Sequence, residues 1–109
     1  MPDVPVERRI ALRYPMVLAV DVVDLPRGAK QSARISDISR TGCYVDTLNP
    51  IPQGARVRIR FTHHQEDFEA IGSVVYVSQG LGMGIQFMEV SQEEQTRLER
   101  WLEEPRREF

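Results

Sequence analysis

Hydrophobic and polar residues alternate strictly in the middle of the chain. Val57, Ile59 and Phe61 are separated by arginines and followed by a threonine in residues 56–62. This period of two predicts a β-strand with one face in a core and the other in water. Gly72 interrupts another apolar segment and is expected to form a bulge or bend. Further strands are predicted over residues 16–23, 32–38, 43–45, 68–77 and 83–88.

Turn residues separate the predicted strands. Residues 25–28 carry proline and glycine at the second and fourth positions, as a type I turn favours, and residues 49–54 form a loop. The run from Gly80 to Gly84 leads into the last strand; it departs from the dinucleotide fingerprint and connects two strands, whereas that fingerprint opens a helix, so it is interpreted as turn chemistry. Short strands joined by turns predict an all-β fold, a closed or nearly closed six-stranded antiparallel barrel.

One helix is expected after the last strand. Ser91 and Glu94 match a capping box, and Pro105 is predicted to mark the far end of the helix. The apolar residues recur at the i, i+3 and i+4 spacing of an amphipathic helix: Leu98, Trp101 and Leu102. The helix is therefore expected to pack its apolar stripe against the barrel. The predicted organisation is a flexible arm over residues 1–14, the barrel and helix over 15–104, and a tail over 105–109.

The charge balance argues against one class of partner. Of 109 residues, 14 are Lys or Arg and 16 are Asp or Glu, which gives a net charge of -2. A general nucleic-acid binder gains most of its affinity from neutralised phosphates and is usually basic. Lys30 is the single lysine, so nearly all the positive charge is arginine. A local arginine site for a small anion stays open.

Cysteine content and the N-terminal sequence bear on the compartment. Cys43 is the single cysteine, which excludes an intrachain disulfide and a Cys-rich zinc site and fits a reducing environment. No apolar run resembles a secretory signal or approaches the length of a membrane span. We therefore expect a cytoplasmic protein.

Enzyme chemistry has weak support in the sequence. Asp37, Ser39 and His63 could form a triad on paper, but Ser39 lies in no nucleophile elbow. His63 and His64 are adjacent, so on a strand they would point to opposite faces, and no acidic or cysteine partner lies at metal-ligand spacing. A polar turn accounts for both histidines. We predict no catalytic activity, no metal and no cofactor.

Two clusters remain as candidates for ligand binding. Arg8, Arg9 and Arg13 lie within six residues, and each guanidinium can donate two parallel bonds to a phosphate or a guanine edge. The alternative for this cluster is an ordinary solvated arm. On an extended chain Asp37 and Ser39 project to one side, where a carboxylate accepts and a hydroxyl donates hydrogen bonds.

The second cluster is completed by Gly42, which allows a positive φ or a close backbone approach. Its alternative is a turn at the end of a strand, in which the polar side chains bond their own backbone.

Together the two clusters resemble a known signature. Residues 9–13 match RxxxR and residues 37–42 match DxSxxG, in the order and context of the PilZ domain, and all five signature positions agree. The resemblance extends over roughly residues 7–103. It includes residues 42–45, the alternating strand after Gly54, residues 82–87 and the C-terminal helix.

This resemblance implies a receptor for cyclic di-GMP, a bacterial second messenger. The family fold is a six-stranded antiparallel barrel with a flanking helix, in agreement with the pattern. Arg9 and Arg13 would clamp phosphates and guanine Hoogsteen edges. The DxSxxG residues would contact a guanine: Asp37, Ser39 and Gly42. Arg8 matches a position where an arginine is associated with an intercalated pair of ligand molecules.

Tyr76 lies where several family members place a side chain against a guanine, although a tyrosine that simply covers the barrel explains it equally well. The expected mechanism is capture of the ligand by the arginines, followed by ordering of the arm and a changed contact with an unidentified downstream protein. Such a receptor would act in biofilm and motility regulation.

Two other classes stay open. The first is a PilZ-like structural or interaction subunit of pilus or motility machinery that binds no nucleotide. The second is a small barrel for single-stranded nucleic acid, supported by the arginines of residues 56–60 and opposed by the net charge of -2. The pattern favours a solvated outer face for those arginines.

Overall fold

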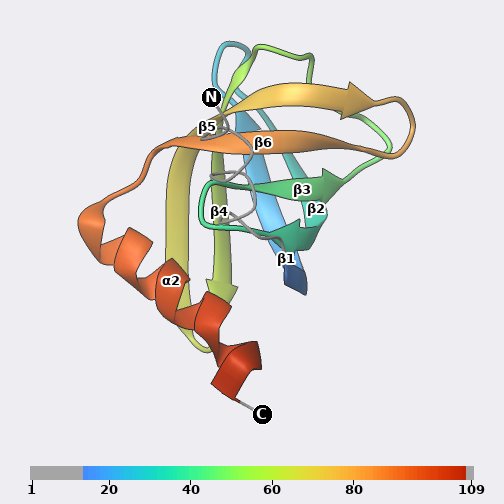
Figure 1. The fold of residues 1–109 in the computed structure, drawn as a ribbon. Helices are drawn as coiled ribbons and strands as arrows, with labels where there is room; N and C mark the ends of the chain where they lie inside the picture. Colours follow the sequence, from blue (N-terminus) through green and yellow to red (C-terminus); the bar gives the residue numbers. More distant parts are fainter. Residues whose placement is uncertain (1–13, 108–109) are drawn as a thin grey trace, which may run out of the picture.

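The computed structural model describes residues 14–107, which form a closed six-stranded barrel and one helix (Figure 1). The strands and helix are β1 (Tyr14–Asp24), β2 (Ala29–Ile38), β3 (Gly42–Asp46), β4 (Arg56–His63), β5 (Glu66–Ser78), β6 (Gly82–Glu89) and α2 (Gln92–Arg107). All strand pairs are antiparallel, in the order β1-β2-β3-β6-β5-β4, and pairing of β1 with β4 closes the barrel. The predicted fold class is confirmed.

The barrel interior is filled by the alternating residues that the sequence indicated. Val57, Ile59 and Phe61 are buried, whereas the arginines between them are exposed. Side chains of the other strands fill the same space, notably Phe68 of the adjacent strand β5, whose ring centroid lies 5.0 Å from that of Phe61. Burial of such side chains contributes on the order of 1.5–3 kcal/mol each, so this core is the main source of stability.

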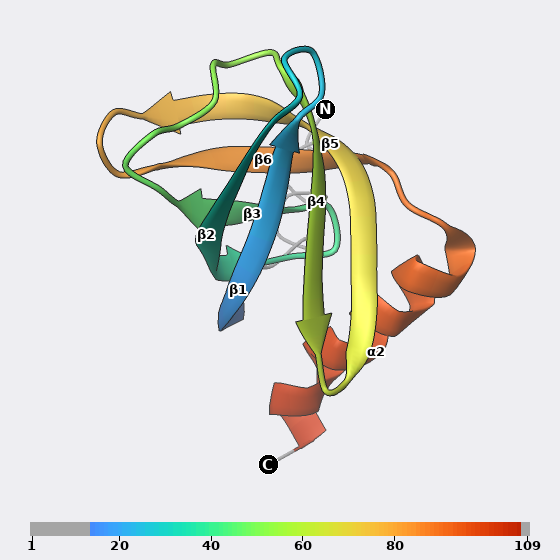
Figure 2. The ribbon, with the colours of Figure 1, turned by 180° about the vertical axis from the view of Figure 1, so that it is seen from behind.

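Helix α2 covers one end of the barrel beside β4 and β5, as Figures 1 and 2 show from opposite sides. Its Leu98 and Trp101 are fully buried. The centroid of the Trp101 ring lies 5.9 Å from that of Phe61 and 6.4 Å from that of Phe68. The predicted apolar stripe is therefore confirmed. None of the helices within residues 14–107 is long and apolar enough to span a membrane.

The start of α2 follows the predicted capping box in part. The hydroxyl of Ser91 accepts a hydrogen bond from the Glu94 amide (3.1 Å) and donates one to Glu94 Oε1 (2.9 Å). The other carboxylate oxygen of Glu94 accepts a hydrogen bond from the backbone amide of Glu69 at 2.8 Å. The cap thus fixes the helix start against β5.

The predicted end of the helix is wrong. Pro105 lies inside α2, which continues to Arg107. A proline this close to the end removes only one helical hydrogen bond, so the last residues can keep helical geometry. At the other end Tyr14 belongs to β1 and not to the predicted arm, while residues 1–13 lie outside the described part.

Register shifts interrupt the barrel at several places. One lies between Ile71 and Gly72, where β5 pairs with β6, but the extra residue is Met88 of β6, so the bulge lies opposite the predicted position and not at Gly72 itself. Two others lie between Ile35 and Asp37 on β2 and between Val74 and Tyr76 on β5. An extra residue in one strand reverses which face the following side chains occupy.

Candidate functional site

The DxSxxG segment forms a tight turn between β2 and β3. The Ser39 amide donates to the Gly42 carbonyl at 2.8 Å, and the Ser39 hydroxyl accepts from the Thr41 amide at 3.2 Å. Ser39 is only 4% exposed. Its hydroxyl therefore bonds the backbone of its own turn, which is the alternative that sequence reasoning left open for this residue. Arg40 and Thr41 point outward at the exposed tip of the turn.

Gly42 is required by a close approach between strands. It pairs with Gln86 of β6, and a β-carbon at position 42 would overlap the carbonyl oxygen of Ile85. Gly42 is not among the described glycines with positive φ. Of the two roles that the sequence allowed, the structure shows the close backbone approach.

The central feature of the site is a row of laterally paired residues on four neighbouring strands. Asp37 of β2 pairs with Tyr44 of β3, Tyr44 pairs with Gly84 of β6, and Gly84 pairs with Tyr76 of β5. The rings of Tyr44 and Tyr76 stack across Gly84 with centroids 6.0 Å apart and planes 30° apart. We call this set the aromatic row.

Two bulges turn the aromatic row outward. Between Ile35 and Asp37, β2 advances by two residues while β3 advances by one, and β5 does the same against β6 between Val74 and Tyr76. Strict alternation would place Asp37 inside with Ile35, and Tyr76 inside with Val74. The structure instead buries Ile35 and Val74, whereas Asp37 is half-buried and Tyr76 is 41% exposed. Bulges often re-aim side chains in this way beside functional sites.

The glycines of β6 make room for the two rings. A β-carbon at Gly84 would overlap the Tyr76 ring, and one at Gly82 would overlap the Val45 carbonyl oxygen and lie 2.8 Å from atoms of the Tyr44 side chain. The prediction that Gly80, Gly82 and Gly84 all belong to a turn is therefore wrong for the last two. Only Gly80, with φ 72°, lies in the turn.

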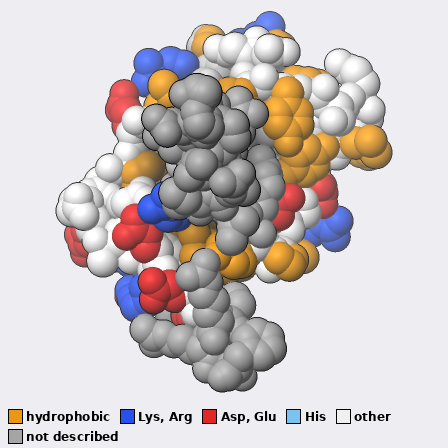
Figure 3. All heavy atoms as spheres, in the orientation of Figure 1, with side chains coloured by type: hydrophobic (Ala, Val, Ile, Leu, Met, Phe, Trp, Pro, Cys, Tyr) orange, Lys and Arg blue, Asp and Glu red, His pale blue; other side chains and the backbone are white. Residues whose placement is uncertain are grey.

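Tyr44 is a site residue that sequence reasoning missed. The signal was available, because Tyr44 lies two residues after the glycine of the DxSxxG motif and is followed by buried Val45. Apolar side chains gather near the row over the β5–β6 end of the barrel, at the right of Figure 3. Leu48 and Leu81, both exposed, line a hollow together with Tyr44. The three arginines predicted to bind phosphate, Arg8, Arg9 and Arg13, lie outside the described residues.

The arginine stripe of β4 is paired with carboxylates of β5 and β6. The ion pairs are Arg56–Glu89 (3.0 Å), Arg58–Glu69 (3.2 Å) and Arg60–Asp67 (3.1 Å). The Thr62 hydroxyl and the Arg60 guanidinium hold the pKa of Asp67 below its usual range by hydrogen bonding. Each stripe arginine therefore faces a negative partner, which favours a solvated outer face over a nucleic-acid track.

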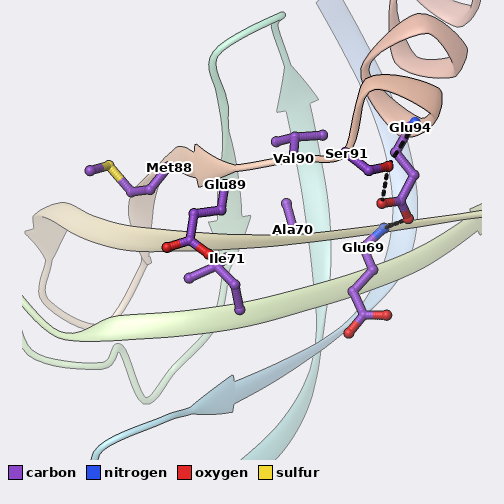
Figure 4. A pocket seen from close by; sticks show the side chains of 8 residues that line it. All are labelled: Glu69, Ala70, Ile71, Met88, Glu89, Val90, Ser91 and Glu94. Atoms are coloured by element: carbon purple, nitrogen blue, oxygen red, sulfur yellow. Dashed lines mark hydrogen bonds between the residues drawn. The ribbon is translucent and has the colours of Figure 1, made fainter.

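A separate hollow lies where β6 leads into α2 (Figure 4). Three glutamates line it, Glu69, Glu89 and Glu94, and the last of these is engaged in the helix cap. These carboxylates already have partners, since Glu69 is paired with Arg58 and Glu89 with Arg56, so the described residues of the hollow offer a phosphate no uncompensated positive charge. The aromatic row is thus the better candidate for a nucleotide.

Comparison with known proteins agrees with this geometry. The family model described as PilZ domain matches residues 7–104. The chain belongs to the PilZ domain family. A search of curated protein sequences gives no match.

Solved PilZ domains share the fold at low sequence identity. The PilZ domain of Escherichia coli YcgR with c-di-GMP has a TM-score of 0.73 and 17% identity, over 93% of this chain and 93% of that one. The PilZ domain of CeSA from a cellulose-synthesizing bacterium has a TM-score of 0.68 and 18% identity, over 84% and 94%. Full YcgR in complex with c-di-GMP gives 0.77 and 18%, and this chain spans 47% of it.

Proposed function

We propose that this PilZ domain is a receptor for cyclic di-GMP. The observation that carries the proposal is the aromatic row, which places Asp37, Tyr44 and Tyr76 on one outer face beside the DxSxxG turn. Two bulges and two glycines of β6 produce this face. Without the bulges, strict alternation would turn Asp37 and Tyr76 toward the barrel interior.

The face suits a guanine base. An exposed tyrosine ring offers a stacking surface worth about 1–3 kcal/mol per base. The Asp37 carboxylate is an acceptor for the guanine N1–H and amino group, and its position next to Tyr44 brings ring and carboxylate to the same base. Ser39 shapes the turn, and the absence of a side chain at Gly42 leaves its backbone close to β6.

The two phosphates of the ligand need positive charge. Arg34 lies near this face, but its guanidinium is held by Asp46 at 2.8 Å. The arginines of the RxxxR segment supply the charge in this proposal, with Arg9 and Arg13 as bidentate donors to phosphate and to guanine Hoogsteen edges. Arg8 extends the clamp to a second, intercalated ligand molecule.

Signalling follows from the position of these arginines. They precede Tyr14, where β1 begins, and the start of β1 lies next to Asp37 through the pair Pro15–Asp37. A ligand bound on the aromatic row therefore draws residues 8–13 onto the same face. The ligand and these residues together form a new surface for a downstream protein.

Support from relatives is of two kinds. The match to the PilZ family and all five signature positions give the ligand class. The neighbours from YcgR are complexes with c-di-GMP, and they share the fold with this chain at 17–18% identity.

Isothermal titration with cyclic di-GMP tests the proposal. We expect saturable binding by the wild type, with two ligand molecules per protein, and loss of binding in Arg9→Ala and Arg13→Ala. The matched control is Arg58→Ala, which removes an exposed arginine paired with Glu69 on β4 and should bind as the wild type does. Folded Arg9→Ala and Arg13→Ala proteins with wild-type affinity would refute the clamp.

A wild-type protein that is folded but does not bind cyclic di-GMP would favour the structural or interaction subunit. Binding to oligonucleotides with a steep salt dependence, and no response to cyclic di-GMP, would favour the nucleic-acid barrel. Amide signals of residues 7–14, followed during the same titration, report whether ligand binding immobilises this segment.

A further inference from the structure

A second group of ligating side chains lies far from the aromatic row, where the β4–β5 hairpin meets the end of α2. Nε2 of His63 lies 3.5 Å from Oε1 of Glu104, and Nδ1 of His64 lies 3.3 Å from Oε2 of Glu104. One ligating atom from each of the three residues can be chosen so that all lie within 4.8 Å of one another. The hairpin tip and the last turns of α2 lie side by side in both views of the ribbon (Figures 1 and 2).

The turn conformation brings the two histidines to the same side. His64 and Gln65 have φ values of 53° and 67°, in the left-handed region, and His63 pairs with Glu66 across this two-residue turn. The expectation that adjacent histidines point to opposite faces is therefore wrong, because His64 has left the strand. The two imidazole rings stack with centroids 3.9 Å apart.

The hairpin departs from the usual turn chemistry. Two consecutive left-handed residues favour Asn-Gly or Asp-Gly, whereas this chain has a histidine and a glutamine there. Left-handed backbone at residues with a β-carbon costs about 1–2 kcal/mol each. Such local strain is common where a side chain is retained for function.

A buried nitrogen in the group lacks a hydrogen-bond partner. The His63 side chain is 16% exposed, and its Nε2 makes no hydrogen bond within the described residues, since the approach to Glu104 falls outside hydrogen-bond geometry. The edge of this ring faces Trp101, at 5.1 Å and 89° between planes. His63 thus holds a ligating atom in a fixed direction toward the carboxylate.

We propose that His63, His64 and Glu104 bind a divalent transition-metal ion of the Zn²⁺ class. Two imidazole nitrogens and one carboxylate oxygen are a known Zn²⁺ ligand set, with a fourth position left for water. Bond lengths near 2.1 Å give ligand atoms about 3.4 Å apart in a tetrahedral site. The His63 nitrogen lies 3.5 Å from Oε1 and the His64 nitrogen 3.3 Å from Oε2 of Glu104, close to that edge, so the carboxylate must turn to present one oxygen to both nitrogens.

Only modest movement completes the site. His64 is 61% exposed, so its ring can rotate away from the stack and bring its nitrogen to the metal. Glu104 is held in place because the same helix buries Trp101 and Leu102. The nearby Glu66 is bound by Arg97 and Arg100, so these cations are balanced and do not take up Glu104.

The proposed ion would join two segments that are distant in the sequence. It would connect the tip of the β4–β5 hairpin to the end of α2 and offset the unpaired nitrogen of His63. This inference does not depend on nucleotide binding, because no residue of the aromatic row takes part.

Titration of untagged, chelator-treated protein with ZnCl₂ and CoCl₂ tests the site. The chain contains two histidines in all, so imidazole signals in NMR report on this site alone. We expect one ion per protein, shifts of both imidazoles, a Co²⁺ visible spectrum typical of four ligands and a higher melting temperature with Zn²⁺. His64→Asn keeps the left-handed turn, since asparagine tolerates it, and Glu104→Gln keeps the side-chain size.

Each of these two variants should lose at least about tenfold in Zn²⁺ affinity, since even outer-shell changes commonly cost 10–100-fold. The matched control is Glu103→Gln, an exposed neighbour on α2, which should bind as the wild type does. Absence of saturable binding by the wild type would mean that the three residues form only an ion pair. Binding that survives both variants would place the ion elsewhere, and either result overturns the proposal.

Discussion

Two outer faces of the same barrel differ in the side chains that they present: one carries arginine–carboxylate ion pairs and the other carries stacked tyrosine rings. On β4 the exposed arginines each contact a carboxylate of β5 or β6, at 3.0–3.2 Å. On the face formed by β2, β3, β6 and the end of β5, two tyrosine rings stack next to Asp37, and Tyr76 is 41% exposed. The first face is neutralised by its own chain.

The difference separates structural chemistry from binding chemistry. Ion pairs between exposed side chains contribute about 0–1 kcal/mol each, so the β4 face adds little stability and offers little free charge to a ligand. The aromatic row is built at a cost, because bulges interrupt the ladder and glycines replace larger residues in β6. A face that gives up strand pairing to expose rings is the better candidate for binding.

The largest effect is expected from Gly42→Ala. The added methyl group would meet the Ile85 carbonyl oxygen, which belongs to the backbone of β6 and cannot rotate away. Overpacking of this kind costs about 1–3 kcal/mol, and the strand shift would also open the Ser39–Gly42 turn. We expect a lower free energy of unfolding in urea and loss of cyclic di-GMP binding together.

Gly54→Ala is the matched control for that substitution. Gly54 has φ 93°, and a β-carbon there meets no atom within 4 Å. It should lose stability through backbone strain alone and keep the nucleotide affinity. Equal loss of binding in both variants would mean that general destabilisation, and not the turn, controls the site.

The next effect concerns the rings. Tyr76→Leu should weaken cyclic di-GMP binding by about 1–3 kcal/mol, the worth of one stacked base, without a comparable loss of stability. Tyr76→Phe keeps the ring and should bind nearly as the wild type does, and Tyr44→Leu should weaken binding through loss of the stacked pair. Titration calorimetry and urea unfolding measure the two quantities. An unchanged affinity in Tyr76→Leu would mean that Tyr76 only packs against Gly84 and does not contact the ligand.

Much of the fold could be predicted from local patterns. The alternation of Val57, Ile59 and Phe61 gave the correct inward face, and the helical spacing of Leu98 and Trp101 gave the correct stripe. Both patterns reflect the periodic spacing of buried residues, which can be recognised within a single strand or helix. The DxSxxG turn was also recognisable, since its residues lie next to one another in the sequence.

Features that depend on pairing between strands could not be predicted. A period of two places Tyr76 on the same side as Val74, and only the register against β6 reveals the extra residue that turns it outward. The role of Gly84 was missed for the same reason, because its neighbour Tyr76 belongs to another strand. Glu104 likewise meets His63 and His64 only through the packing of α2.

A smaller effect tests the β4 face. Arg58→Ala removes an ion pair whose side chains are 45% and 47% exposed, so we expect a change in unfolding free energy below about 1 kcal/mol. Cyclic di-GMP affinity should be unchanged, because the stripe lies on β4, outside the four strands of the aromatic row. A large loss of ligand affinity in Arg58→Ala would contradict the claim that the β4 face takes no part in ligand binding.

The smallest effect concerns Glu66, at the start of β5, and its contribution to the pH dependence of stability. The hydrogen bond from Arg100, together with the charges of Arg100 and Arg97, holds the pKa of Glu66 below its ordinary value of 4.5. A carboxylate with a lowered pKa in the folded state stabilises the fold above the unfolded pKa, and this contribution is lost as the pH falls through the folded value. Glu66→Gln should therefore lower the free energy of unfolding slightly near neutral pH, where the carboxylate contributes, and converge with the wild type as the pH falls below about 4.5, as measured by urea unfolding at several pH values. Because the Glu66 side chain is 39% exposed, screening keeps the effect small, and a variant that matched the wild type near neutral pH but was less stable in acid would contradict this assignment.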